Sequence, residues 1–241
     1  MSDDESESEG YDVFRQGRDR AVLAVPIAAW PPQPIKVDHP QIRAVRFVSA
    51  VVDPLHGWAD IWVDLRSRWV ILRNRRTYAF TIYTPSQIAA EMEEDDLTVH
   101  NDYDQLIVRE LTVPCIVDGV SKMLEMGCID RMGVGPSDIG YPRPPRRPPR
   151  IRAIEWGTAD PSSPGAEITV VLANGRRYQF APLIIASIAD ELRKPSRLSF
   201  VKEGLLVVRE VSDDCVRKGV EELIKNGGLE RHGVRLGKAK S

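Results

Sequence analysis

Residues 107–134 read IVRELTVPCIVDGVSKMLEMGCIDRMGV, and residues 207–234 read VVREVSDDCVRKGVEELIKNGGLERHGV. The two stretches align without a gap at an offset of 100, and 10 of the 28 aligned positions are identical. The identical pairs include Cys115/Cys215, Gly119/Gly219 and Gly127/Gly227. A match of this length indicates that the chain contains an internal repeat.

The repeat extends toward the N-terminus of each copy. Residues 76–92 align with 176–192 at the same offset, and residues 40–47 align with 149–156 at an offset of 109. A long period that occurs only twice predicts duplicated domains rather than a solenoid. The predicted parts are an acidic and proline-rich N-terminal tail or arm (1–38), a first copy (39–135), a linker (136–150), a second copy (151–236) and a C-terminal tail (237–241).

The strands are easiest to predict in the second copy. Ile151–Trp156 is an extended segment, and Glu167–Leu172 and Arg176–Pro182 flank the dipeptide Asn174-Gly175. Asn-Gly between apolar runs is the strongest short signal for a β-hairpin. We expect three such strands in each copy, followed by a helix, a fourth strand and a second helix. The order β-β-β-α-β-α predicts an α+β fold in which each copy is an antiparallel sheet with its helices on one face.

The predicted helices have recognisable ends. Thr84 and Gln87 have the spacing of a capping box at the start of the first helix. The second helix is expected to begin after Thr112 and to end at Gly127, and the second copy has equivalent residues at both ends. Gly119 lies inside this helix, as does its counterpart in the second copy. Because glycine weakens a helix by about 1 kcal/mol relative to alanine, this position predicts a close contact between helix and sheet.

The composition limits the class of protein. The chain has 241 residues, of which 42% are hydrophobic and 28% charged, and its net charge is −2. These values are typical of a globular protein and give no strong overall attraction to nucleic acid. No apolar run reaches the roughly 20 residues that a membrane-spanning helix needs. The acidic N-terminus is unlike a secretory signal, and the three cysteines form no C-x-x-C motif. We therefore expect a cytoplasmic protein without disulfide bonds and without a membrane partner.

Charge is divided unevenly along the chain. Residues 41–134 carry ten basic and fourteen acidic side chains, whereas residues 151–241 carry fifteen basic and twelve acidic ones. The linker alternates prolines with four arginines, which are Arg143, Arg146, Arg147 and Arg150. Proline-rich segments favour an extended, stiff conformation. We interpret the linker as a solvated spacer; the alternatives are a ligand for an SH3-type domain and a contact for nucleic acid.

Motifs for catalysis are absent from the sequence. It contains no phosphate-binding loop, dinucleotide fingerprint or metalloprotease motif. None of the four histidines aligns with a histidine in the other copy. The one notable cluster is Asp53, His56 and Asp60, which could act as a general base or a ligand set, although a polar loop is the simpler interpretation. We therefore predict no enzyme activity, no cofactor and no metal site.

Features that the two copies do not share are the candidates for partner binding. Tryptophan is enriched at binding hot spots, and the first copy has Trp58, Trp62 and Trp69 on or beside its hairpin. A patch of carboxylates steers a basic partner toward a protein. The acidic candidates are Glu93, Glu94, Asp95, Asp96, Asp102 and Asp104. The alternative is that Trp62 and Trp69 are core residues and that the acidic residues form a solvated loop.

The stretch YAFTIYTPSQI at residues 78–88, followed by a short helix, the strand LIVRE at 106–110 and an amphipathic helix, resembles small bacterial immunity proteins of polymorphic toxin systems. Those proteins carry a strand that leads through a Thr-Pro turn into a helix. The second copy matches more weakly because it lacks the Thr-Pro. The resemblance implies a cytoplasmic protein that neutralises a toxin by binding it, and it assigns no binding residue because immunity interfaces vary.

Three hypotheses about function follow from the sequence. The leading one is a non-enzymatic, cytoplasmic protein-binding module, with an immunity or antitoxin role as one version. The second is a nucleic-acid-associated protein that uses the Arg/Pro linker and the basic second copy. The third is a hydrolase built on the loop with Asp53, His56 and Asp60.

Overall fold

The computed structural model of the chain describes residues 33–49, 51, 53–66, 77–100, 105–133, 147–157 and 166–237. All of these residues belong to one compact unit. We call the described residues up to 133 the first half and those from 147 onward the second half.

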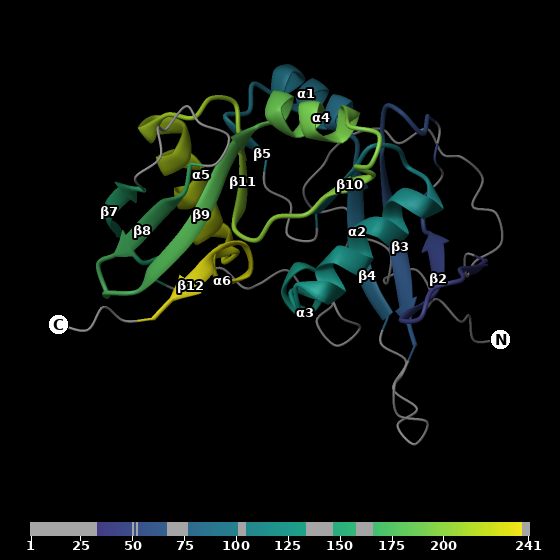
Figure 1. Cartoon of the computed structure of the whole chain (residues 1–241). Coiled ribbons are helices and arrows are strands. Elements are labelled where there is room, and N and C mark those ends of the chain that lie inside the picture. Colours follow the sequence, from purple (N-terminus) through teal and green to yellow (C-terminus); the bar gives the residue numbers. More distant parts are fainter. Residues whose placement is uncertain are drawn as a thin grey trace, which may run out of the picture. The chain divides into compact units, whose positions relative to one another are not determined.

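The order β-β-β-α-β-β-α-α occurs in both halves, with β1 before it in the first half and β12 after it in the second (Figure 1). The first half contains β1 (Ile35–Lys36), β2 (Ile42–Phe47), β3 (Trp58–Leu65), β4 (Thr77–Tyr83), α1 (Pro85–Glu94), β5 (Val99–His100), β6 (Gln105–Val108), α2 (Val113–Glu125) and α3 (Ile129–Met132). The second half contains β7 (Ile151–Trp156), β8 (Ile168–Leu172), β9 (Arg177–Ile184), α4 (Ile185–Arg193), β10 (Ser199–Phe200), β11 (Leu205–Val208), α5 (Asp213–Asn226), α6 (Leu229–His232) and β12 (Val234–Leu236). The α+β class expected from the sequence is therefore present.

The prediction of purely antiparallel sheets is wrong, because both sheets are mixed. One sheet has the strand order β1-β2-β3-β4-β6-β10, and the other has the order β5-β11-β9-β8-β7 with β12 also paired to β9. Within them, β4 runs parallel to β6 and β9 runs parallel to β11. A helix lies between the two strands of each parallel pair along the chain. This helix returns the chain to the end at which the first strand began, so the next strand runs in the same direction.

The two halves exchange short strands. Strand β5 of the first half pairs with β11 of the second half, and β10 of the second half pairs with β6 of the first. Equivalent backbone hydrogen bonds extend both pairings, from Arg109 N–H to the Leu198 carbonyl and from Arg209 N–H to the Thr98 carbonyl, each 2.9 Å long. Neither strand was expected from the sequence. Each sheet is therefore built from segments of both halves (Figure 1).

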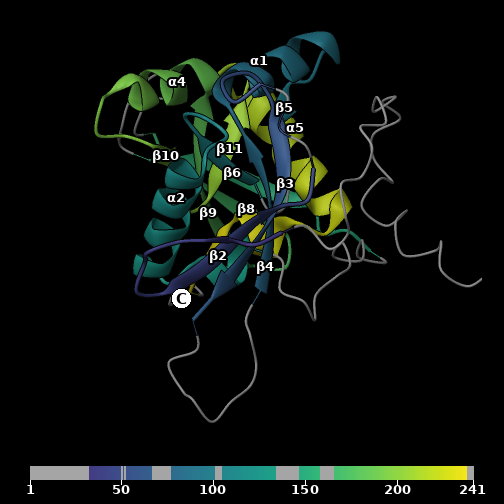
Figure 2. The same cartoon turned by 90° about the vertical axis from the view of Figure 1, so that its right-hand side faces the viewer.

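The helices lie on both faces of the sheets, so the prediction of a single helical face is also wrong. In β6, Leu106 and Val108 pack in one core cluster with residues of α2, whereas Ile107 packs with residues of α1. Successive side chains of a strand point to opposite faces, so α1 and α2 lie on opposite sides of this strand. Helices α1 and α4 lie side by side in both views (Figures 1 and 2).

A core shared by both halves lies beneath α1 and α4. Its buried members come in equal numbers from the two halves and are Tyr83, Ile88, Met92, Ile107, Leu183, Ile188, Leu192 and Val207. Two ion pairs also connect the halves: Asp96 with Arg209, at 2.6 Å, and Arg131 with Glu203. Burial of apolar surface is the main favourable term in folding, so these contacts make the stability of each half depend on the other.

The predicted helix ends are mostly confirmed, with one correction. Ser212 caps α5 by accepting a hydrogen bond from Cys215 N–H (3.3 Å), and Gly227 ends it in the left-handed conformation with φ of 78°. The capping box at Thr84 is absent. Thr84 is the N-cap residue of α1, but its hydroxyl accepts from the N–H of Gly57 (3.1 Å) and so anchors the loop before β3 instead.

Candidate functional site

A groove of about 700 Å³ lies between the last linker residues and helix α5. Its lining comes from two segments and consists of Arg147, Pro148, Pro149, Arg150 and Ile151 on one side and Arg217, Glu221, Ile224 and Lys225 on the other. The α5 residues follow the spacing of one helical face. The linker residues lead directly into β7, so the groove runs beside the start of that strand.

The groove has an apolar floor and a basic rim. Ile224 is buried and Ile151 is half-buried, whereas Arg147, Arg150, Arg217 and Lys225 are exposed. Within the described part of the chain, none of these four cationic side chains has a hydrogen-bond or ion-pair partner. Among the described residues, Glu221 is the one acidic member of the lining. The groove is therefore suited to a ligand that presents both carboxylates and apolar side chains.

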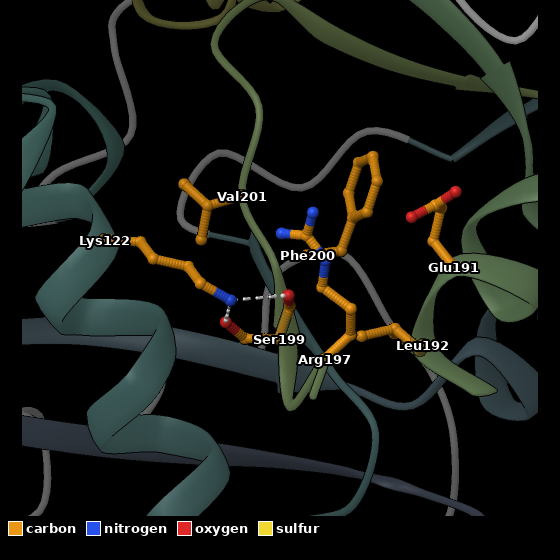
Figure 3. A pocket seen from close by; sticks show the side chains of 7 residues that line it. All are labelled: Lys122, Glu191, Leu192, Arg197, Ser199, Phe200 and Val201. Atoms are coloured by element: carbon orange, nitrogen blue, oxygen red, sulfur yellow. Dashed lines mark hydrogen bonds between the residues drawn. The ribbon is translucent and has the colours of Figure 1, made fainter. Parts of the chain in front are cut away.

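A second and smaller pocket, of about 140 Å³, lies where β10 meets α2 and α4 (Figure 3). Lys122 of α2 points toward Ser199, and its Nζ donates to the Ser199 carbonyl and hydroxyl oxygens, both at 3.2 Å. Asp118 completes the network, because it accepts from Lys122 Nζ (2.7 Å) and from Ser199 Oγ (2.6 Å). These polar groups satisfy one another across the exchanged strand, which indicates a structural role for this pocket.

The predicted acidic surface lies at the end of α1. Glu93, Glu94, Asp95 and Asp96 are exposed, and Asp96 pairs with Arg209 of the second half. Asp102 and Asp104 lie outside the described residues. Arg209 also donates to the Met92 carbonyl oxygen, so part of the predicted partner surface contacts the basic half of the same chain.

The predicted tryptophan surface is only partly described. Trp58 and Trp62 lie on β3, and both are half-buried. Their side chains face away from Ala59, Ile61 and Val63, which are buried under α2. Trp58 packs against the core cluster shared by the two halves. Trp69 lies outside the described residues, as do Arg143 and Arg146 of the linker.

The loop with Asp53, His56 and Asp60 divides into two separate hydrogen-bonded groups. Asp53 Oδ2 lies 3.1 Å from His56 Nδ1, and both side chains are well exposed. The backbone N–H of Leu55 donates to Asp53 and, with His56, lowers the pKa of that carboxyl below its usual value. Asp60 is on β3, where it accepts from Thr81 Oγ1 at 2.9 Å. This exposed pair lines neither of the pockets described above.

A buried polar pair that the sequence analysis missed lies on the exchanged strand β5. His100 Nε2 lies 3.0 Å from Glu91 Oε2, and their side chains are 3% and 6% exposed. Gln105 and Gln87 complete the group, at 3.3 Å from His100 Nδ1 and 3.0 Å from Glu91 Oε1. Tyr83 packs edge-on against the imidazole, with 5.0 Å between ring centroids. The group is enclosed by the core, so we assign it a structural role in holding β5.

The comparisons with known proteins returned no match to a family model, to a curated protein or to a solved structure. No helix in the described ranges is long and apolar enough to span a membrane. In the same ranges, no group of three or more His, Cys, Asp or Glu side chains is placed to hold a metal ion.

Proposed function

We propose that the chain is a non-enzymatic protein-binding module whose basic groove binds an acidic segment of a partner protein. The observation that carries the proposal is the set of four exposed cations that have no partner among the described residues and surround an apolar floor. Charge-assisted hydrogen bonds to carboxylates contribute about twice as much as neutral ones. An acidic segment would supply these bonds to the rim and apolar contact to Ile151 and Ile224.

Nucleic acid is the second candidate ligand. It is favoured by Arg147 and Arg150 of the linker and by the basic excess of residues 151–241. One feature of the groove favours a protein segment instead. Among the described residues, the lining contains no aromatic side chain on which a base could stack.

We also propose that the two halves are a duplicated unit, supported by their shared element order and equivalent strand exchange. Neutralisation of a toxin in the cytoplasm, as the resemblance to immunity proteins implies, is one version of the binding function. In that version the acidic partner segment belongs to the toxin. The acidic end of α1 and the tryptophans of β3 stay a predicted contact surface for a basic region of the same partner.

The proposal is tested with a fluorescent peptide, acetyl-Thr-Glu-Thr-Val-Thr-Glu-Thr, which combines carboxylates with an apolar residue. Fluorescence anisotropy with the full-length chain measures its affinity. Arg217→Glu should weaken binding about tenfold or more, because it replaces a charge-assisted hydrogen bond by repulsion. Lys218→Glu is the matched control, since Lys218 is exposed on the same helix and does not line the groove.

Two results would contradict this function. Equal losses for Arg217→Glu and Lys218→Glu would show that the peptide responds to overall charge and not to the groove. A DNA duplex that displaces the peptide at a lower concentration than the unlabelled peptide does would favour nucleic acid as the ligand.

A further inference from the structure

Strand β7 has an edge beside the groove that is open among the described residues. Its inner edge pairs antiparallel with β8, and among the residues that the structure describes no strand pairs with its outer edge. Gly157 N–H donates to the Glu167 carbonyl on the β8 side (2.8 Å). Because strand residues alternate, the N–H groups of Ile154 and Trp156 point to the outer side. An unpaired edge of this kind is a template for another strand.

The first half shows what covers the equivalent edge. Strand β2 aligns with β7, and its outer edge pairs antiparallel with β1, with Ile35 opposite Val45 and Lys36 opposite Ala44. Val37 continues this pairing through its N–H to the Arg43 carbonyl (3.2 Å), and its side chain packs against the core.

A hydrogen bond also connects the segment after β1 to helix α2. His39 Nε2 lies 3.0 Å from Ser121 Oγ, and His39 Nδ1 accepts from Ile42 N–H at 3.1 Å. The residues that align with Val117 and Ser121 of α2 are Arg217 and Glu221 of α5, which line the groove. The groove of the second half therefore lies where residues 35–39 lie in the first half.

The residues that align with Ile35 and Lys36 of β1 are Pro144 and Pro145, which lie outside the described residues. Proline has no N–H to donate to a neighbouring strand. Residues 147–150 have no regular secondary structure. In the second half, cations border the space beside β7. In the first half, the residue that aligns with Arg217 is the apolar Val117.

We infer that the acidic segment binds by adding an antiparallel strand to the outer edge of β7, at the place that β1 takes on β2. This inference rests on the proposed function and specifies its binding mode. In the added strand, residues whose N–H groups point to β7 also face α5, as Val37 faces the core of the first half. Those residues alternate between acidic and apolar, so that carboxylates contact Arg217 and Lys225 and an apolar side chain contacts Ile224.

The test uses two N-methylated versions of the peptide, which have the same charge. In one version the N-methyl groups are on the Glu and Val residues, whose amides would point to β7. In the matched control they are on the threonines, whose amides would point to solvent. The first version should bind about tenfold more weakly than the parent peptide, because it loses main-chain hydrogen bonds, and the control should bind as the parent does.

The outcomes separate this inference from the proposed function. If both methylated peptides bind as tightly as the parent, or lose affinity equally, strand addition is overturned. If, in addition, Arg217→Glu weakens binding and Lys218→Glu does not, the basic groove is still supported as the site for an acidic segment. If the parent peptide does not bind the full-length chain, the proposed function itself fails, and the binding mode fails with it.

Discussion

The exchange of strands between the halves predicts an energetic coupling between Gly219 and Val99. Gly219 is in α5 of the second half, and Val99 is in β5 of the first. A methyl group at Gly219 would lie 2.8 Å from Val99 Cγ2, 3.0 Å from Val99 Cγ1 and 3.3 Å from Leu206 Cδ1. Both methyl groups of Val99 are too close, so rotation of the valine side chain cannot relieve the contact. Gly219→Ala therefore requires β5 or α5 to shift.

The expected changes in the free energy of unfolding follow from this geometry. Overpacking costs about 1–3 kcal/mol, and alanine recovers about 1 kcal/mol of helix propensity, so Gly219→Ala should destabilise by about 1 kcal/mol. Val99 is 5% exposed. Val99→Ala should cost about 2 kcal/mol through lost burial and a cavity. In the double variant the new methyl group occupies that cavity, and the total loss should be about 1 kcal/mol.

Urea unfolding of the full-length single and double variants measures this cycle. The sum of the single losses should exceed the loss in the double variant by about 2 kcal/mol. Gly119→Ala with Val99→Ala is the control cycle, because a methyl group at Gly119 would contact Leu106 and Ser199 and not Val99. That pair should add to within about 0.5 kcal/mol. Additivity of the Gly219 and Val99 losses would refute the placement of β5 on α5.

Three further predictions concern other parts of the chain. His100→Ala should destabilise by about 3 kcal/mol in urea unfolding, because it removes the imidazole beside the buried Glu91 carboxylate, and a loss below about 1 kcal/mol would contradict this role. Burial, with the hydrogen bond to Glu230, raises the pKa of Tyr178, so the protein should lose stability as the pH rises above about 10, where the unfolded phenol ionises and Tyr178 does not. Tyr178→Phe should reduce this loss, as measured by urea midpoints at increasing pH. Trp58→Ala should lower the melting temperature more than Trp62→Ala, because, of these two tryptophans, Trp58 is the one that packs against a core cluster of described residues. Equal shifts in melting temperature would contradict that packing.

The elements with strong local signals could be predicted from the sequence. Helices α2 and α5 begin after Thr112 and Ser212, as their N-cap residues predict. The hairpin at Asn174-Gly175 is present, with Gly175 at a φ of 78°. Gly119 and Gly219 were expected to mark close helix–sheet contacts, and the close approach of Leu106 and Val99 confirms this. These features depend on residues that are neighbours along the chain or along one helical face.

The direction and exchange of the strands could not be predicted in the same way. Strands β5 and β10 each contain two residues, Val-His and Ser-Phe, which is too short for any periodic pattern. Their partner strands lie about 100 residues away along the chain. Pairing between segments so far apart leaves no local pattern in the sequence. Thr84 fits the sequence pattern of a capping box, but its hydroxyl accepts a hydrogen bond from Gly57 N–H instead. Tertiary structure overrode local preference in these places.

The groove was predicted only on its linker side. Arg147 and Arg150 were singled out as basic, whereas Arg217 and Lys225 were missed because α5 also carries four acidic residues, a mixture typical of a solvated helix. The spacing of Arg217, Glu221 and Lys225 becomes informative only once the end of the linker is known to lie beside that face. A site made of two segments far apart in sequence has no motif of its own.

The first half contains an example of the strand arrangement that we infer for β7. In the first half, the edge of β2, the strand β1 and the contact of His39 with Ser121 form a complete unit. In the second half, the corresponding edge and helix face are present, and Pro144 and Pro145 align with the two residues of β1. The bulge between the first residues of β2 and the one in β7 occur at the same aligned positions, so the two edges have the same local irregularity. A partner strand bound to β7 would therefore restore an arrangement that this chain already forms once, and the cations at Arg217 and Lys225 would select an acidic segment for that place.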